Sequence, residues 1–143
     1  MKPFELEAVL KYRKRLKDIA VNKFEEAKKQ FEAARSTLAK TSEERQTLIN
    51  TLAGMQQQGV DIQDHIRFEN RIEFLAERIK LLQVELDKKQ GAVVRARNTL
   101  MQKSKEEKVM EKLKERQNDE WRQFLDKKES AMLDEIAVLY GKR

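Results

Sequence analysis

The chain has 143 residues, of which 39% are charged and 6% aromatic, with four Gly, one Pro, no Cys and a net charge of +6. So many charges and so few turn-forming residues exclude a domain built around a central three-dimensional core, and favour a coiled coil or long helix. The absence of Cys excludes disulfides and thiolate chemistry. No stretch is apolar enough for a secretory signal or a membrane span, so we expect a soluble cytoplasmic protein.

The first predicted element is a helix over about residues 4–54. Pro3 stands where a helix tolerates proline, at its start. From Ala20 to Met55 the apolar positions advance by alternating steps of four and three residues, which is the repeat of a coiled-coil seam. The large apolar residues of this seam are Phe24, Phe31 and Leu38.

A turn over about residues 55–60 separates this helix from a second one over about residues 61–139. Gly54 and Gly59 flank the turn, and Asp61 is a suitable N-cap for the following helix. The second repeat places four large apolar residues on the seam: Ile72, Ile79, Leu82 and Leu86. Two apolar stripes joined by a short connection pack antiparallel. The sequence therefore predicts an all-α fold, a single two-helix coiled-coil hairpin over residues 1–143 with a longer second helix.

The lengths of the two helices predict an asymmetric hairpin. With the turn centred near residue 57, Arg45 would face Glu69 and form an ion pair across the seam. The start of the first helix would face about residue 110 of the second helix, so that roughly 30 residues of the second helix project beyond it. This overhang carries Trp121 and Phe124. An apolar stripe without an internal partner calls for another protein, self-association or local disorder.

Side chains suited to catalysis are scarce. The sequence has no Gly-rich phosphate loop, and its single histidine, His65, lies on the seam beside the turn. We interpret His65 as a packing residue and the paired glutamates as solvated helix faces. We expect no enzymatic activity, no cofactor, no metal site and no small-molecule substrate.

Basic residues gather at the open end of the predicted hairpin. Five cations fall within seven residues: Lys11, Arg13, Lys14, Arg15 and Lys17. The facing part of the second helix, residues 95–112, is also basic. A solvated face, an acidic protein surface, and the phosphates of a membrane or nucleic acid are all compatible with this cluster. Nucleic acid is disfavoured because no aromatic residues are interleaved with the cations.

Both ends of the chain resemble the FliJ family, small coiled-coil proteins of the flagellar type III export apparatus. Residues 4–13 match the family's opening pattern Phe-x-Leu-x-x-Val-Leu-x-x-Arg, and residues 111–117, Glu-Lys-Leu-Lys-Glu-Arg-Gln, are similar to its C-terminal half. The length and the Gly-containing turn also match, so the resemblance covers essentially the whole chain.

The resemblance implies a stalk-like protein at the inner face of the cell membrane. Such a protein binds the export ATPase ring and promotes its assembly, contacts the cytoplasmic domain of the export gate and escorts export chaperones. The candidate contacts with the ATPase ring are Lys11, Arg13, Lys14, Arg15, Lys17, Arg116, Gln117, Trp121 and Phe124. The candidate contacts with the export gate are Leu48, Phe68 and Leu75.

Two alternatives stay open at this point. The equivalent stalk protein of a virulence type III secretion system would share the same architecture. A basic structural coiled coil that binds a membrane or nucleic acid would share the composition. The overhang could also pair with a second copy of the chain.

Overall fold

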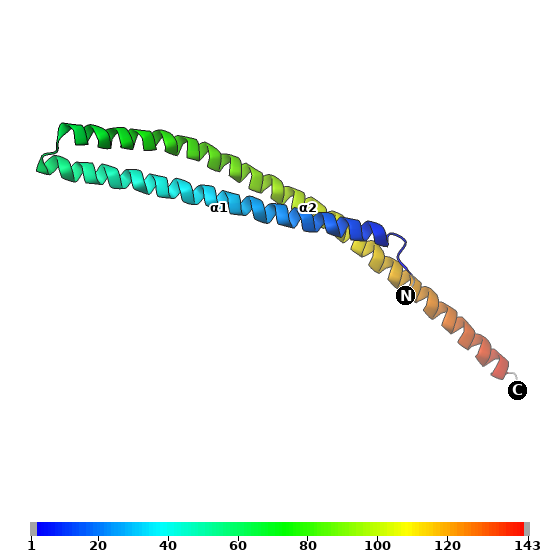
Figure 1. Cartoon of the computed structure of the whole chain (residues 1–143). Helices are drawn as coiled ribbons and strands as arrows, with labels where there is room; N and C mark the ends of the chain where they lie inside the picture. The colour runs from blue at the N-terminus through cyan, green and yellow to red at the C-terminus, as the bar shows by residue number, and fades with distance from the viewer. Residues whose placement is uncertain (1–2, 142–143) are drawn as a thin grey trace. The chain divides into compact units, whose positions relative to one another are not determined.

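The computed structural model describes residues 3–141, and the predicted domain limits 1–143 therefore include four residues outside the described range. Two helices are present, α1 over Glu7–Gln58 and α2 over Ile62–Gly141, and the described part contains no strand. The two helices form an antiparallel hairpin with a longer second helix (Figure 1), which confirms the predicted fold class. The chain packs as two compact units, Val21–Thr99 on one hand and Met1–Ala20 with Leu100–Arg143 on the other.

In the unit Val21–Thr99, the repeat read from the sequence coincides with the half-buried positions. Leu52 and Leu75 are buried. The predicted seam residues are half-buried, whereas their neighbours one position away in sequence are mostly exposed: Phe24, Phe31, Leu38, Ile72, Ile79, Leu82 and Leu86. Burial of this stripe holds the two helices together, because long helices of this polarity gain little from intrinsic propensity alone.

The turn lies later in the chain than predicted. Gly54 is inside α1, which continues to Gln58, and the helix ends only at Gly59, whose φ of +82° is in the left-handed region that glycine adopts without strain. Asp61 directly precedes α2 as its N-cap, with its carboxylate Oδ1 accepting from the backbone N–H of Gln63 at 3.4 Å. One glycine, not two, terminates the first helix.

The later turn changes which residues face each other. The connection is centred near residue 60 rather than 57, so each residue of α1 meets α2 about six positions later than predicted. Arg45 Nε donates to the backbone oxygen of Ile72 at 3.3 Å, while Glu69 accepts from His65 Nε2 at 3.0 Å on its own helix. The predicted Arg45–Glu69 ion pair is therefore wrong.

Thr41 shows how the seam accommodates a polar residue. Its hydroxyl donates to the backbone oxygen of Thr37 at 2.8 Å, and Thr37 in turn donates to Ala33 at 3.0 Å. Bonding to the carbonyl four residues earlier satisfies the hydroxyl within its own helix. The half-buried Thr41 thus needs no partner on α2.

In the other unit, the first turns of α1 pack against the middle of α2. Residues 3–6 are not helical: α1 begins three residues later than predicted, where Glu7 N–H donates to the backbone oxygen of Phe4 at 3.1 Å. Leu10, Ala20 and Met110 form the buried apolar contacts. Lys103 and Glu107 fall on the seam past Leu100, and the four-three pattern of reduced exposure continues through them as far as Trp121.

Candidate functional site

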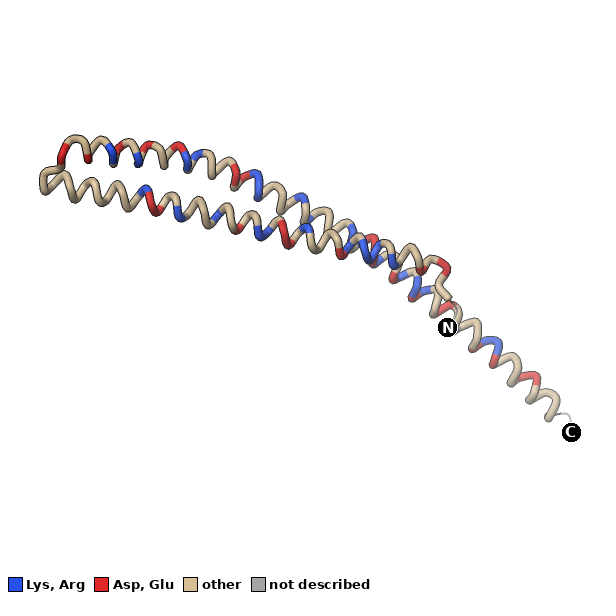
Figure 2. Tube along the Cα trace, viewed as in Figure 1, with Lys and Arg blue, Asp and Glu red and all other residues tan. Residues whose placement is uncertain are grey.

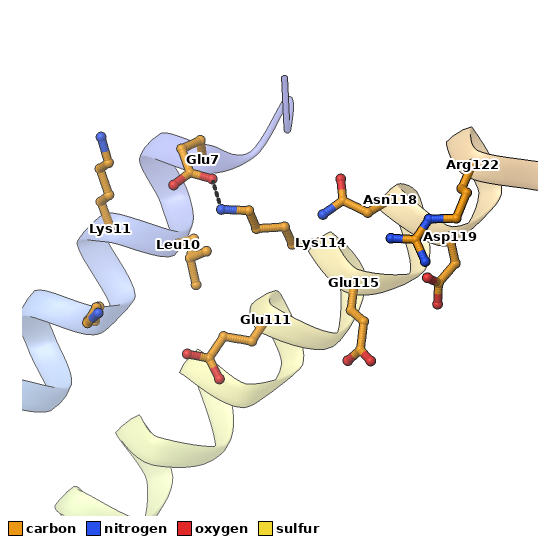
Figure 3. Close-up of a pocket in the computed structure, with 10 residues that line it drawn as sticks. Glu7, Leu10, Lys11, Glu111, Lys114, Glu115, Asn118, Asp119 and Arg122 are labelled. Atoms are coloured by element: carbon orange, nitrogen blue, oxygen red, sulfur yellow. Dashed lines mark ion pairs between the residues drawn. The ribbon is translucent and has the colours of Figure 1, made fainter. Parts of the chain in front are cut away.

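A groove of about 710 Å³ lies between the first turns of α1 and the facing part of α2. Leu10 is its buried apolar residue, and charged side chains from both helices surround it (Figure 3). The groove is lined by Glu7, Leu10, Lys11, Lys14, Glu111, Lys114, Glu115, Asn118, Asp119 and Arg122. Its lining mixes both signs of charge around a single apolar residue, Leu10, which suits contact with another polar protein surface better than enclosure of a small molecule.

Two contacts fasten the beginning of the chain to α2 at this groove. Lys114 Nζ lies 3.0 Å from Glu7 Oε2, the ion pair drawn in Figure 3. Gln117 Nε2 donates to the backbone oxygen of Pro3 at 3.3 Å. Gln117, a predicted ring contact, therefore already serves an internal contact. We predicted that the start of the first helix faces about residue 110 of the second. In the structure, the contacts between the start of the chain and α2 extend further, to Gln117.

The five clustered cations of α1 divide into two groups. Arg13 Nη1 donates to the backbone oxygen of Glu106 at 3.2 Å, and Lys17 Nζ lies 3.4 Å from Glu107 Oε2. These two side chains are half-buried and help to hold the helices together. Lys11, Lys14 and Arg15 are exposed.

Cations of α2 add to these three. Lys105, Lys108, Lys112 and Arg116 are exposed on the part of α2 that belongs to the same unit. Figure 2 shows Lys and Arg on both helices near the start of α1, with acidic residues between them. We call the three exposed α1 residues Lys11, Lys14 and Arg15 the basic cluster. It is available to an anionic surface.

Past Trp121, every residue of α2 up to Gly141 is exposed. This C-terminal extension, residues 122–141, spans about 30 Å. Trp121 is half-buried at its base and stacks on Phe124, with ring centroids 5.4 Å apart and planes inclined by 22°. The extension carries several large exposed apolar side chains: Phe124, Leu125, Met132, Leu133, Ile136, Val138, Leu139 and Tyr140.

The candidate gate residues lie on the helix–helix interface of the other unit. Leu48 and Phe68 are half-buried, and Leu75 is only 3% exposed. The Leu75 side chain cannot reach a partner while the two helices remain packed. Their assignment to the gate stays a prediction, because apolar seam residues and apolar contact residues follow the same seven-residue period in the sequence.

A second apolar set on α2 was missed. Phe74, Leu81 and Val84 are 58%, 65% and 59% exposed. The signal was present in the sequence, since Phe74 and Leu81 stand seven residues apart, one position from the seam residues Leu75 and Leu82. We call these three residues the outer apolar face.

His65 lies half-buried beside the turn. Gln56 Nε2 can only donate, so its contact of 3.3 Å with His65 Nδ1 makes Nδ1 the acceptor, and Nε2 carries the hydrogen that Glu69 accepts at 3.0 Å. Both ring nitrogens are thus occupied by neighbouring side chains. Among residues 3–141, no three acidic or histidine side chains gather closely enough to hold a metal ion.

Neither helix of the described chain contains a stretch with the length and apolarity that a membrane crossing requires. No curated protein matches the sequence. Among solved structures, one described as a YscO homologue, CT670, from Chlamydia trachomatis has a similar fold, with a TM-score of 0.51 and 20% sequence identity over 99% of this chain and 94% of that one. The family model described as "Flagellar FliJ protein" matches residues 1–143. The chain belongs to the flagellar FliJ protein family.

Proposed function

We propose that this protein is a stalk-like component of flagellar type III protein export that binds the export ATPase ring through its open end. The observation that carries this proposal is the C-terminal extension, a helix with eight large exposed apolar side chains beside the exposed basic cluster. Apolar surface of this extent on a charged protein is typical of an interaction site. The family match supports the flagellar system over a virulence secretion system.

The two parts of this surface would contribute differently. Phe124 and the apolar residues that follow it supply the area that leaves water on binding, and large apolar side chains dominate interface energies. The basic cluster of Lys11, Lys14 and Arg15 is exposed, so its charges act mainly on the rate and salt dependence of association. Arg116 belongs with this group, being exposed on α2. Arg13, Lys17 and Gln117 would support the site through their internal contacts.

A binding assay with the export ATPase of the same organism tests the proposal. Replacing both Trp121 and Phe124 by Ala should weaken binding at least about tenfold and reduce stimulation of ATP hydrolysis and ring assembly. The matched control replaces Phe74 and Leu81 by Ala, which removes similar exposed apolar area from the other unit. Equal binding by the wild type and the Trp121–Phe124 variant would refute this contact, and no effect of the wild-type protein on the ATPase would refute the stalk role.

Contact with the export gate is a further part of the proposal. Because Leu75 is buried, a gate contact through Leu48, Phe68 and Leu75 would require the helices to separate. The outer apolar face offers exposed side chains without such opening. We therefore expect Phe74→Ala with Leu81→Ala to weaken binding of the gate's cytoplasmic domain while leaving ATPase binding unchanged. Escort of export chaperones and peripheral attachment to the inner face of the cell membrane belong to the same proposed role.

A further inference from the structure

The C-terminal extension has a seven-residue repeat in its sequence. Three pairs of adjacent apolar residues recur at intervals of seven: Phe124 and Leu125, Ala131 and Met132, Val138 and Leu139. This is the spacing that keeps side chains on one face of a coiled-coil helix. All six residues are exposed, so the face has no partner within the described chain.

This face continues the interface between α1 and α2. The seam of α2 passes through Met110, Lys114, Gln117 and Trp121 by steps of four and three, all of them half-buried or buried. The next positions in that series are Phe124, Lys128, Ala131, Glu135 and Val138. The extension therefore presents the same side of α2 that packs on α1, beyond the point where α1 begins.

Four of the charges between the apolar pairs are arranged with a two-fold symmetry. Lys127 and Lys128, flanked by Asp126 and Glu129, lie between the first and second pairs, and Asp134 and Glu135 lie between the second and third. Reversal of the segment about Ala131 exchanges Lys127 with Glu135, Lys128 with Asp134 and Phe124 with Val138. A surface that is complementary to itself after a half-turn is the requirement for a two-fold symmetric interface.

We propose that the C-terminal extension pairs with the same segment of a second copy of this chain, as an antiparallel coiled coil centred on Ala131. Phe124 then packs against Val138 of the partner subunit. Lys127 and Lys128 lie opposite the acidic pair of the other copy, at both ends of the interface. The small side chain of Ala131 at the centre allows the two helices to approach closely.

The order of charges selects the antiparallel orientation. In a parallel pair in register, Lys127 and Lys128 would face the same two lysines, and the acidic pair would face itself. Like charges placed directly opposite each other are unfavourable, whereas the antiparallel arrangement places each of these two lysines opposite an acidic residue. The pairing would use Phe124, which the proposed ATPase contact also uses, but its test needs only the purified chain, so the two proposals can fail separately.

Sedimentation equilibrium of the full chain tests the pairing, with charge-reversed variants. One variant carries Lys127→Glu and Lys128→Glu, and the other carries Asp134→Lys and Glu135→Lys. Each alone should raise the dimer dissociation constant by about tenfold or more, because attraction becomes repulsion at four places. An equimolar mixture of the two should dimerise again, since every reversed charge then faces an opposite one. The control Lys29→Glu with Lys40→Glu changes the net charge equally on exposed sites of the other unit and should leave dimerisation unchanged.

Cysteine crosslinking fixes the orientation, because the natural chain has no Cys. Ala131→Cys should form a disulfide-linked dimer on mild oxidation, since the two copies meet at this residue. Val138→Cys should not, because its counterpart in the other copy would be about 21 Å away, far beyond disulfide reach. A monomer at about 100 µM, a dimer insensitive to both charge reversals, or efficient crosslinking through Val138→Cys would each overturn the proposal.

Discussion

The carboxylate Oε2 of Glu107 lies 3.4 Å from Nζ of Lys17, inside the interface between the two helices, where the Glu107 side chain is only 9% exposed. Lys17 is itself 30% exposed and also lies 3.9 Å from Asp18. The pair occupies a seam position that would otherwise hold an apolar residue. Its lysine comes from the cluster that the sequence suggested was a contact surface for a partner.

We expect Lys17→Met to destabilise the fold by about 2–3 kcal/mol, because it leaves the Glu107 carboxylate buried without a cation. Lys17→Met combined with Glu107→Leu should return to within about 1 kcal/mol of the wild type, since two apolar side chains of similar volume replace the pair. Urea unfolding followed by circular dichroism measures both. A double variant no more stable than the single one would show that the ion pair itself stabilises the interface.

The two glycines near the turn should respond in opposite ways to replacement by Ala. Gly59→Ala should lower the free energy of unfolding by about 1 kcal/mol, because alanine is strained at a φ of +82°. Gly54→Ala should raise it by about 0.5–1 kcal/mol, since Gly54 is helical and an added Cβ meets no atom within 4 Å. Because both variants carry the same Gly-to-Ala change, each is the control for the other. Thermal unfolding measures the stability of both. A loss of stability at Gly54 would contradict its placement inside α1.

The neighbours Phe74 and Leu75 should separate packing from surface contact. Leu75→Ala should cost about 2–4 kcal/mol, because the side chain is 3% exposed between the helices and its removal leaves a cavity. Phe74→Ala should cost less than about 1 kcal/mol, since the ring is 58% exposed and the guanidinium carbon of Arg71 lies 5.3 Å from its centroid. Chemical denaturation of the two variants measures the loss in free energy of unfolding of each. Equal losses would indicate that Phe74 also packs in the interface.

Loss of the Glu7–Lys114 ion pair should loosen the start of α1 without unfolding the protein. We expect Lys114→Ala to accelerate amide hydrogen exchange between Phe4 and Leu10 by about two- to fivefold, because a partly exposed pair contributes up to about 1 kcal/mol locally. Lys80→Ala is the matched control: it removes the 3.0 Å pair with Glu77 within α2. Faster exchange at residues 4–10 in the control would mean that the effect is not local.

The order of apolar and polar residues alone determined two long helices, their antiparallel pairing and the residues that share a seam. It could do so because burial of one stripe per helix is the dominant favourable term in such a fold, and its period is visible in the sequence. The sequence also indicated that the second helix runs beyond the first.

The tertiary structure decided the register of the two helices and which polar side chains lie in their interface. A seven-residue repeat fixes the face of a helix but not its position along its partner, so the register depended on whether Gly54 or Gly59 ends α1. The cost of a glycine within a helix, about 1 kcal/mol, is smaller than the gain from extending the seam by a further turn that half-buries Met55. Leu113 is 40% exposed, while Lys114 is half-buried beside it and pairs with Glu7. Which side chain faces inward there follows from the helix phase that packing imposes, and not from hydrophobicity.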